Sequence, residues 1–438
     1  ISFEHSGKTP VIGLLTYNQY RGALIDLACL SFGIRVIPIP INSTSNHLTF
    51  ILHQAQISHL FIGGETAIQI WNDVQENHDI QVIGLDNSET LRGQVFDWES
   101  FLDQGEDFNL QERLNLVSMD RTVSIMYTSG TTANPKGIIF SQINILSKRF
   151  ARALALPEIG HQDTFLAYLP LFHTFGRFFE LLGSIYWGAT YVFAESPAFN
   201  SLLKDFIISK PSVFISIPKR WVQLYETIEE IGSLDKTDES VIKKNITDLT
   251  GGQLKWGLSA AGYLDPDIFA FFQDHGIQLL SGYGMTEATG GITMTPPNEY
   301  IPDSVGKSLP GINLKLNSDG ELCLQGPYVT AGYFDDDSSA FRDGWFHTGD
   351  IFEKREGHYF ILDRKKDIYK NSRGQTIAPQ KIENLFQDFD LVGNVFLVGD
   401  GREFNTVLIW PNHENLLVDL ITISEKEIRD LYSAMILS

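Results

Sequence analysis

Apolar and polar residues alternate along the first 280 positions in a rhythm that predicts strands and helices in turn. The apolar run Val11–Leu15 predicts a strand, and Gln19–Phe32 predicts a helix because its apolar residues recur at helical spacing. Strand and helix taking turns in this way are typical of parallel sheets covered by helices. The other segments that we assign by the same pattern are the strands Arg35–Ile39, His59–Ile62, Ser212–Ile217, Leu254–Ser259 and Gln278–Gly282, and the helix Leu48–Gln54.

The pattern changes after about Val305, where short strands and glycine-containing turns replace the longer units. These strands are expected at Asn313–Leu316, Gly320–Gln325 and His358–Leu362. Short strands joined by tight turns favour an antiparallel, β-rich subdomain. The densest charge cluster, Asp363–Asp367, separates it from a small final region.

Composition limits the classes of protein to which this chain can belong. With 438 residues it is too long for one ordinary core, so we expect more than one lobe. No apolar run approaches the ~20 residues that a membrane-spanning helix needs. The formal net charge of −21 disfavours non-specific binding to nucleic acid or to an anionic membrane.

Cysteine usage and the start of the chain add two expectations. Cys29 and Cys323 are isolated in apolar sequence, which suits a reducing cytosol and argues against a disulfide framework. We therefore expect a cytoplasmic location, and leave peripheral contact with a membrane open. The chain begins at Ile1 rather than at Met, in what looks like the middle of a fold, so we expect a piece of a longer protein.

The segment Tyr127–Gly137 (YTSGTTANPKG) concentrates small hydroxyl residues, glycines and one lysine between two apolar runs. Backbone N–H groups, hydroxyls and an ammonium gathered in one loop are suited to holding a polyphosphate. A Walker A loop is disfavoured because Pro135 replaces its second glycine and Gly137 replaces its Ser/Thr, although Gly130 has the right offset to Lys136. A surface loop without a ligand remains the alternative for this segment alone.

Two aromatic segments downstream offer further chemistry. The run Leu169–Phe179 places His173 among four phenylalanines, which indicates either core packing or the wall of an apolar pocket with a polar gate. In Ser281–Gly290, glycines flank Tyr283, so a planar ligand can stack close to the backbone. Thr286 and Glu287 follow, suited to phosphate and Mg²⁺ respectively. An ordinary strand-to-helix turn is the weaker interpretation.

The segment Gly344–Asp350 ends in a carboxylate within a tight turn. Such a carboxylate can accept hydrogen bonds from a ribose diol. A metal pair of His347 and Asp350 is the poorer alternative, because no other ligands accompany it.

Taken together, these motifs resemble the adenylate-forming (AMP-binding) superfamily, which includes acyl-CoA synthetases, luciferases and peptide-synthetase adenylation domains. The resemblance covers roughly Val11 to Pro411, with five motifs in the expected order. It looks closest to the long-chain fatty acyl-CoA synthetases. This resemblance rests on the sequences of the segments Leu169–His173, Gly332–Phe334, Asp363–Asp367 and Ile377–Asn384.

The resemblance implies an α/β fold with two parts. A large N-terminal AMP-binding domain (1–363) would hold two helix-covered β-sheets and the β-rich subdomain (about 305–363). A small, incomplete C-terminal α+β domain (364–438) would swing about a hinge at Lys366.

The resemblance also implies a role for each matching residue. Tyr283, beside Gly284, would stack on adenine, Thr286 would contact the α-phosphate and Glu287 would bind Mg²⁺. His173 would line the acyl entrance. Asp350 and Arg364 would contact the ribose; Ser259, Ala260, Ala261 and Gly262 would form the turn beside adenine; and Thr128, Ser129, Gly130, Thr131, Thr132 and Lys136 would hold the β- and γ-phosphates.

The implied activity is that of an AMP-forming acyl-CoA synthetase using ATP, Mg²⁺ and CoA. A carboxylic acid, in particular a long-chain fatty acid, would become an acyl-adenylate with release of pyrophosphate, and a thiol would then take the acyl group. One alternative is an acyl-AMP ligase that loads a carrier-protein phosphopantetheine, with additional domains outside this chain. Another is an impaired homologue that only binds nucleotide or acyl ligand. No nucleic-acid partner is expected.

Two positions depart from the family pattern. Ala133 stands where glycine is usual, which restricts φ in the loop. The family also carries a C-terminal lysine that touches the substrate carboxylate and the α-phosphate. Here the final segment holds only Lys426, in a charged, helical pattern that does not match, so we do not transfer that role to it.

Overall fold

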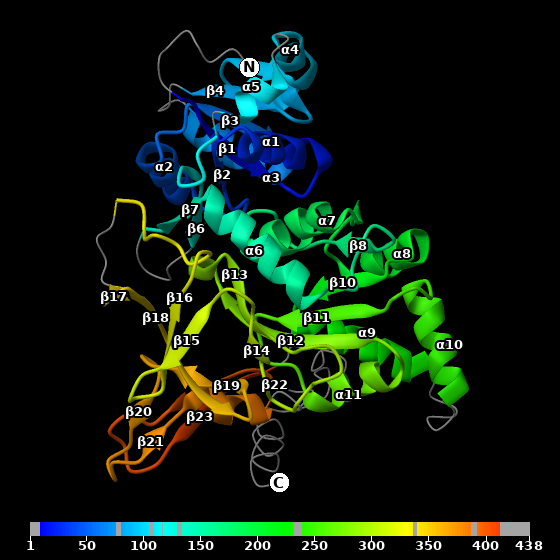
Figure 1. Ribbon diagram of the computed structural model, residues 1–438, viewed down its shortest axis with the longest axis vertical. Helices are drawn as coiled ribbons and strands as arrows, with labels where there is room; N and C mark the ends of the chain where they lie inside the picture. Colours follow the sequence, from blue (N-terminus) through cyan, green and yellow to red (C-terminus); the bar gives the residue numbers. More distant parts are fainter. Residues whose placement is uncertain are drawn as a thin grey trace, which may run out of the picture. The chain divides into compact units, whose positions relative to one another are not determined.

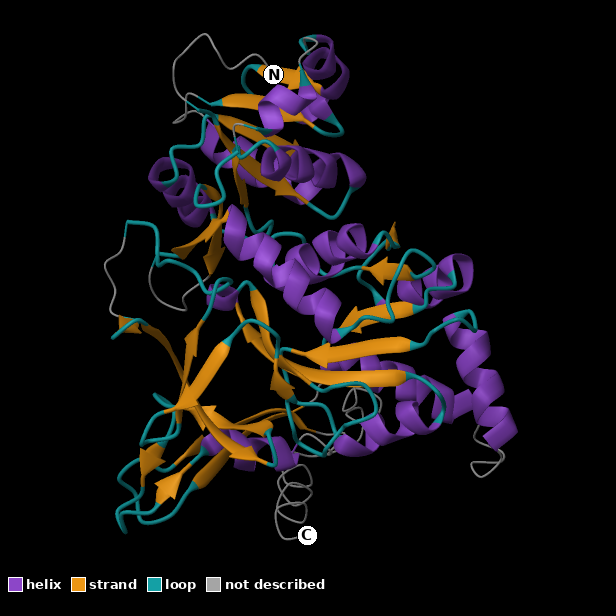
Figure 2. Ribbon diagram, viewed as in Figure 1, coloured by secondary structure: helices purple, strands orange, loops and turns teal. Residues whose placement is uncertain are grey.

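The structure is a computed structural model that describes residues 9–75, 80–105, 109–115, 117–128, 134–231, 239–335, 340–386 and 392–411. By its internal contacts the chain divides into two compact units. The first comprises Ile1–Leu314, Leu324–His347 and Glu356–Tyr359, and the second comprises Lys315–Cys323, Thr348–Arg355 and Phe360–Ser438. The helices and strands are labelled in Figure 1 and coloured by type in Figure 2.

The first unit begins with a seven-stranded sheet in the order β5-β4-β3-β1-β2-β6-β7. The pairs from β5 to β6 are parallel, and only β7 runs antiparallel to its neighbour β6. Its strands are β1 (Val11–Thr16), β2 (Arg35–Pro38), β3 (His59–Gly63), β4 (Gln81–Gly84), β5 (Val95–Asp97), β6 (Thr122–Thr128) and β7 (Lys136–Ser141).

Helices bury both faces of this sheet because successive strand residues point to opposite sides. Leu15 packs in one core cluster with residues of α2 and α3, and Ile12 packs in another with residues of α1. Several helices begin at side-chain caps, such as Thr44 before α2 and Asp97 before α4. The helical elements are α1 (Tyr20–Ser31), α2 (Ser45–Gln54), α3 (Glu65–Val74), η2 (Ser88–Thr90), α4 (Trp98–Asp103) and α5 (Leu110–Leu114).

The second sheet also has seven strands, in the order β14-β13-β12-β11-β10-β8-β9. The strands from β9 to β12 are parallel, and β13 and β14 are antiparallel additions. They are β8 (Thr164–Ala167), β9 (Thr190–Phe193), β10 (Val213–Ser216), β11 (Trp256–Ala260), β12 (Gln278–Met285), β13 (Gly290–Met294) and β14 (Lys307–Ser308).

Helices pack on both faces of the second sheet as well. Trp221, Phe206 and Phe272 form one core cluster with strand residues, while Phe179 and Leu156 belong to the cluster on the other side. Helix α6 begins with a capping box between Ser141 and Asn144. The elements are α6 (Gln142–Ala155), the π-helix η3 (Phe175–Leu181), α7 (Leu182–Trp187), α8 (Phe199–Ser209), α9 (Pro218–Ile231), α10 (Glu239–Thr250), α11 (Pro266–Asp274) and η4 (Thr286–Ala288).

A third, five-stranded sheet follows, and its strands contribute residues to both units. Its order is β15-β16-β18-β17, with β19 paired to β18; two two-stranded sheets, β20-β21 and β22-β23, come later in the chain. The elements are β15 (Asn313–Leu316), β16 (Glu321–Gln325), β17 (Phe341–Arg342), β18 (Trp345–Arg355), β19 (His358–Arg364), β20 (Tyr369–Lys370), β21 (Thr376–Ile377), α12 (Pro379–Glu383), η5 (Asn384–Phe386), β22 (Val392–Val398) and β23 (Thr406–Pro411).

The predicted α/β fold is confirmed, with two helix-covered, mainly parallel sheets followed by shorter antiparallel strands. The boundary predicted near 363 stays a prediction, since the two compact units interleave along the chain. Lys426 lies outside the described residues. Within the described part of the chain, no helix is both long and apolar enough to cross a bilayer.

Candidate functional site

The predicted phosphate loop connects the antiparallel strands β6 and β7. Thr128 at the end of β6 pairs with Lys136 at the start of β7, and the Lys136 side chain is exposed. Ser129, Gly130, Thr131, Thr132 and Ala133 lie outside the described residues, so their roles stay predictions. The hairpin nevertheless fixes both ends of the loop and brings Thr128 beside Lys136.

The loop departs from the Walker pattern at Gly137, and the local structure explains why glycine occupies this position. It pairs with Tyr127 on β6, whose ring lies over it. A Cβ at Gly137 would stand 3.1 Å from Cε1 and Cζ of Tyr127 and 2.9 Å from Cγ2 of Ile125. A Ser or Thr at this position would therefore displace the buried Tyr127 ring, whose hydroxyl donates to Gln54 Oε1 at 2.9 Å.

The segment Thr330–Phe334 pairs with the outer edge of β7. Ile139 N donates to Gly332 O at 3.2 Å, and Phe334 N donates to Gly137 O at 2.7 Å. Thr330 also reaches η4, because its N–H donates to Glu287 O at 2.7 Å while its hydroxyl donates to Ile139 O at 2.6 Å. This segment, which we call the edge segment, thus ties the lysine strand to the turn that carries the predicted metal-binding glutamate.

Three predicted or motif residues meet at the edge segment. The Tyr333 hydroxyl donates to Glu287 Oε1 at 2.9 Å, and Lys136 Nζ lies 5.1 Å from the centroid of the Tyr333 ring. A cation and a carboxylate are therefore held on one tyrosine. An ammonium suits phosphate oxygens and a carboxylate suits Mg²⁺, so this donor set fits a magnesium-bound polyphosphate.

The predicted adenine turn follows β11. Ser259 and Ala260 on β11 pair with Ser281 and Gly282 on β12, so the two motifs are neighbours in the second sheet. The Ser259 hydroxyl is buried and has no protein hydrogen-bond partner. Such a buried polar atom calls for a partner.

Beyond β11 the chain turns sharply. Ala261 has a φ of +68°, a left-handed conformation that is uncommon for alanine. Gly262 is exposed directly after it. Backbone strain of this kind concentrates at functional sites.

Strand β12 carries the predicted adenine-stacking residue at a bulge. The register with β13 shifts between Tyr283 and Gly284, and Tyr283 is half-buried. A Cβ on Gly284 would lie 2.5 Å from Gly290 O and 2.6 Å from Gly291 Cα, so only glycine permits this approach of the two strands.

The strand then passes into η4, which carries Thr286 and Glu287. Thr289 ends this turn at a φ of +55°, and its hydroxyl donates to Tyr328 O at 2.7 Å. The weaker interpretation of this segment was an ordinary turn from a strand into a helix. The structure instead has a single 3₁₀ turn between β12 and β13.

His173 precedes η3 and is exposed. Its Nδ1 accepts a hydrogen bond from Phe175 N at 3.2 Å, which leaves Nε2 as the protonated nitrogen of the neutral ring. Neighbouring protein atoms lower its pKa through desolvation. Phe178 and Phe179 of the same run are buried in core clusters, whereas Phe172 and Phe175 are half-buried. Core packing therefore accounts for half of the aromatic run.

Asp350 and Arg364 belong to the second unit. Asp350 follows Gly349, which has a φ of +74°, and Asp350 N donates to Thr348 Oγ1 at 3.1 Å. Arg364 Nε lies 3.9 Å from Asp350 Oδ1, so the structure brings the two predicted ribose contacts together. Lys366, the predicted hinge, is exposed two residues further on.

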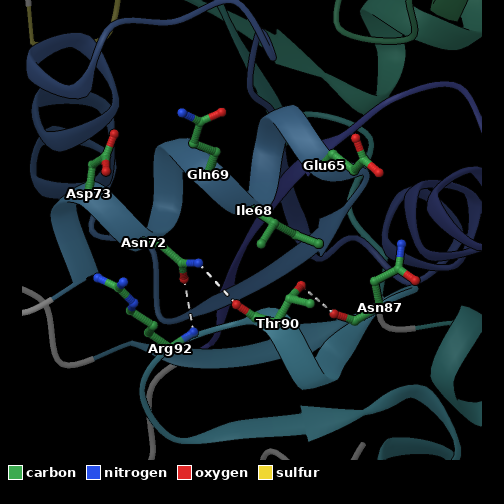
Figure 3. A pocket seen from close by; sticks show the side chains of 8 residues that line it. All are labelled: Glu65, Ile68, Gln69, Asn72, Asp73, Asn87, Thr90 and Arg92. Carbon is green, nitrogen blue, oxygen red and sulfur yellow. Dashed lines mark hydrogen bonds between the residues drawn. The ribbon is translucent and has the colours of Figure 1, made fainter.

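A surface pocket of about 500 Å³ lies elsewhere in the first unit, between α3 and the turn around Asn87–Arg92 (Figure 3). Asn72 spans it, donating to Thr90 O at 3.0 Å and accepting from Arg92 N at 2.9 Å. None of the predicted site residues lines this pocket, and the Asn72 amide in it is already bonded to the protein backbone.

Comparison with known proteins decides the family to which this chain belongs. The family model for "AMP-binding enzyme" matches residues 5–334. The chain belongs to the AMP-binding enzyme family. The match ends at Phe334, the last residue of the edge segment.

Curated relatives of this AMP-binding enzyme are long-chain acyl-CoA synthetases. "Long chain acyl-CoA synthetase 6, peroxisomal" of Arabidopsis thaliana is 26% identical over 456 residues, covering 91% of this chain and 64% of the relative. "Long-chain-fatty-acid--CoA ligase 1" of Homo sapiens is 27% identical over 463 residues, covering 92% and 66%. The resemblance to this branch is confirmed. The chain spans 64% of the length of the Arabidopsis relative.

Solved structures agree on the fold. An o-succinylbenzoate CoA synthetase from Bacillus subtilis in complex with an acyl-adenylate intermediate has a TM-score of 0.74 and 20% identity, covering 96% of this chain and 83% of that chain. The same enzyme in complex with ATP and magnesium ion has a TM-score of 0.72 and 23% identity, covering 92% and 80%.

The sequence interpretation missed a set of buried cations in the AMP-binding domain. Lys148 and Arg152 on α6 are both buried. Lys148 donates to Gly291 O on β13, and Arg152 lies 4.2 Å from the ring centroid of Phe179 on η3. Burial, and secondarily repulsion from Arg152, lower the pKa of Lys148. Charges on a helix normally indicate a solvent-facing side, so the sequence pattern gave no signal for this packing behind the glycine-rich strands.

Proposed function

We propose that the protein activates a carboxylic acid, in particular a long-chain fatty acid, with ATP, and passes the acyl group to the thiol of CoA. Family membership and the curated relatives support the reaction class. The observation that carries the proposal is that Lys136 and Glu287 both contact Tyr333, one over its ring and the other at its hydroxyl. This arrangement offers a cation and a carboxylate to one magnesium-bound triphosphate.

In the first step a carboxylate oxygen of the acid attacks the α-phosphorus of ATP. The P–O bond to the β-phosphate breaks, and pyrophosphate leaves with the electron pair. Lys136, with the loop hydroxyls of Thr128, Ser129, Thr131 and Thr132, would neutralise charge on the leaving pyrophosphate. Glu287 would hold Mg²⁺, which when bound supplies further neutralisation of phosphate charge.

Other residues would bind and orient the nucleotide. Tyr283 would stack on adenine beside the turn Ser259–Gly262, whose Ser259 hydroxyl lacks a protein partner. Thr286 would contact the α-phosphate. Asp350 and Arg364, paired in the second unit, would contact the ribose hydroxyls. His173, with its neutral ring, would line the entrance for the acid.

In the second step the thiol sulfur attacks the acyl carbon, and AMP leaves with the electrons of the broken C–O bond. We propose that residues 364–438 belong to a small domain that swings about Lys366 between the two steps, and that the large domain ends near 363. A cytoplasmic location suits the two cysteines, which are both buried.

The test is a pyrophosphate-release assay on the full-length protein, with ATP, Mg²⁺ and carboxylic acids of graded chain length. We expect release that rises with acyl length, because each buried CH₂ contributes ~0.8 kcal/mol. CoA and a phosphopantetheinylated carrier protein are then compared as acceptors. Absence of release with every acid would overturn the proposal, and transfer only to the carrier protein would replace CoA as acceptor.

A further inference from the structure

Tyr333 contacts two residues that the proposed reaction needs, and neither of them is near it in sequence. Its hydroxyl hydrogen-bonds Glu287 Oε1 at 2.9 Å, and its ring faces Lys136 Nζ at 5.1 Å. The hydroxyl and the ring therefore serve different partners. One side chain thereby sets the place of a carboxylate and of an ammonium at the same time.

The backbone around Tyr333 is bonded to two other elements of the fold, β7 and η4. Tyr333 forms an isolated antiparallel bridge with Ile138, and its neighbour Phe334 donates to Gly137 O at 2.7 Å. On the other side Thr330 N donates to Glu287 O at 2.7 Å. The edge segment thus fixes the backbone of Tyr333 relative to both β7 and η4.

The hydrogen bond matters because Glu287 has a long, rotatable side chain and lies on a single 3₁₀ turn. A donor on Oε1 restricts rotation of the carboxylate plane and presents the group in one orientation. Partners of this kind around metal ligands typically change metal affinity or activity 10–100-fold when they are lost. The ring adds an attraction for the Lys136 ammonium through its negative face.

We propose that Tyr333 is a positioning residue that holds the metal-binding carboxylate of Glu287 and the phosphate-binding ammonium of Lys136 in place relative to each other. The proposal rests on the proposed function, since it assigns Mg²⁺ to Glu287 and polyphosphate to Lys136. It separates two effects, because the hydroxyl acts on Mg²⁺ and the ring acts on the nucleotide.

Two variants separate the hydroxyl from the ring. Tyr333→Phe removes the hydroxyl and keeps the ring, whereas Tyr333→Leu removes both. Tyr328→Phe is the matched control, because it also deletes one hydroxyl from a tyrosine under a lysine, but that hydroxyl donates to Pro310 O at 3.1 Å. Thermal melting of each variant checks that it is folded.

The measurement is ATP binding by calorimetry on the full-length protein, in EDTA and across a Mg²⁺ titration, with no acid present. We expect Tyr333→Phe to raise the Mg²⁺ concentration for half-maximal binding about 10-fold or more while leaving ATP affinity in EDTA unchanged. Tyr333→Leu should weaken binding in EDTA as well, and Tyr328→Phe should match wild type.

A wild-type Mg²⁺ requirement in Tyr333→Phe would overturn the proposal, as would an equal effect in Tyr328→Phe. A wild-type protein that binds no ATP with Mg²⁺ would overturn it too. ATP binding is measured without an acid, so it is independent of the pyrophosphate-release assay. Failure of every acid to release pyrophosphate would count against the proposed function, but it would not change the conclusion about Tyr333 and Mg²⁺-dependent ATP binding.

Discussion

Arg177 and Asp26, which are 151 positions apart in the sequence, form a buried, bidentate ion pair. Arg177 Nε donates to Asp26 Oδ2 at 2.7 Å, and Arg177 Nη2 donates to Asp26 Oδ1 at 2.5 Å. Arg177 Nη1 also donates to Ser124 Oγ at 2.7 Å. Arg177, which is four residues after His173, thereby joins η3 to α1 and to strand β6 of the first sheet.

Replacing one partner of this ion pair should lower the free energy of unfolding more than replacing both partners by apolar residues. Asp26→Ala leaves the Arg177 guanidinium buried without its carboxylate, so we expect the free energy of unfolding to fall by about 3–5 kcal/mol. The double variant Asp26→Leu/Arg177→Met replaces both charges by apolar groups and should recover most of that loss. Urea unfolding of the two variants and wild type measures both values; a double variant no better than Asp26→Ala would contradict this account.

Glu180 should make stability depend on pH. It is buried on η3, and burial raises its pKa well above the usual value, outweighing the opposing effect of the Leu169 backbone. The folded state therefore keeps a proton that the unfolded state releases above about pH 4.3. Stability contributed by this group is full below that pH and is lost as pH rises towards the folded-state pKa.

The neutral variant Glu180→Gln removes this titration. We expect it to be more stable than wild type at pH 8, with the advantage shrinking towards pH 4. Thermal unfolding across that range measures the difference. Glu230→Gln, at an exposed position on α9, is the control and should change the free energy of unfolding by less than about 0.5 kcal/mol at any pH. A pH-independent difference for Glu180→Gln would show that the carboxyl is not the cause.

Glu287→Ala should abolish Mg²⁺-dependent adenylate formation, because the proposed metal loses its carboxylate ligand. Pyrophosphate release measured against Mg²⁺ concentration is the readout. Glu299→Ala serves as the control, since Glu299 is an exposed residue that pairs with Lys307. Turnover like that of wild type in Glu287→Ala would remove this residue from its assigned role.

Lys366→Pro should block thioester formation and spare pyrophosphate release. Proline fixes φ near −65°, so a hinge at this exposed position could no longer rotate. Lys366→Ala, which keeps backbone freedom, should support both steps. The two half-reactions are assayed separately on the full-length protein, and unchanged thioester formation in Lys366→Pro would defeat the hinge assignment.

Local pattern located many elements because it reflects burial within each strand or helix. The strands at Val11, Arg35, His59 and Asn313 begin where apolar periodicity placed them. Strand β12 runs on to Met285, beyond the predicted end at Gly282, because antiparallel pairing with β13 extends it through a glycine-rich stretch. That extension depends on a partner strand, which a local window does not contain.

The site was predicted as separate motifs, and its internal contacts were not. Tyr333 was noted only as part of a family signature, whereas its hydroxyl binds Glu287, 46 positions away. Arg177 was part of an aromatic run with no assigned role, and its partner is 151 positions away. Long-range pairs of this kind follow from the packing of sheets and helices, which composition and spacing do not specify.

The edge segment has a consequence for biosynthesis. Strand β7 stands at the end of its sheet, and the only chain described as covering its outer edge comes much later, with Thr330 bonded to Ile139 across 191 positions. Until that length has been synthesised, β7 presents open backbone groups that can pair with another nascent chain. Variants that loosen the edge segment would then lower the yield of native protein by aggregation as well as disturb Glu287.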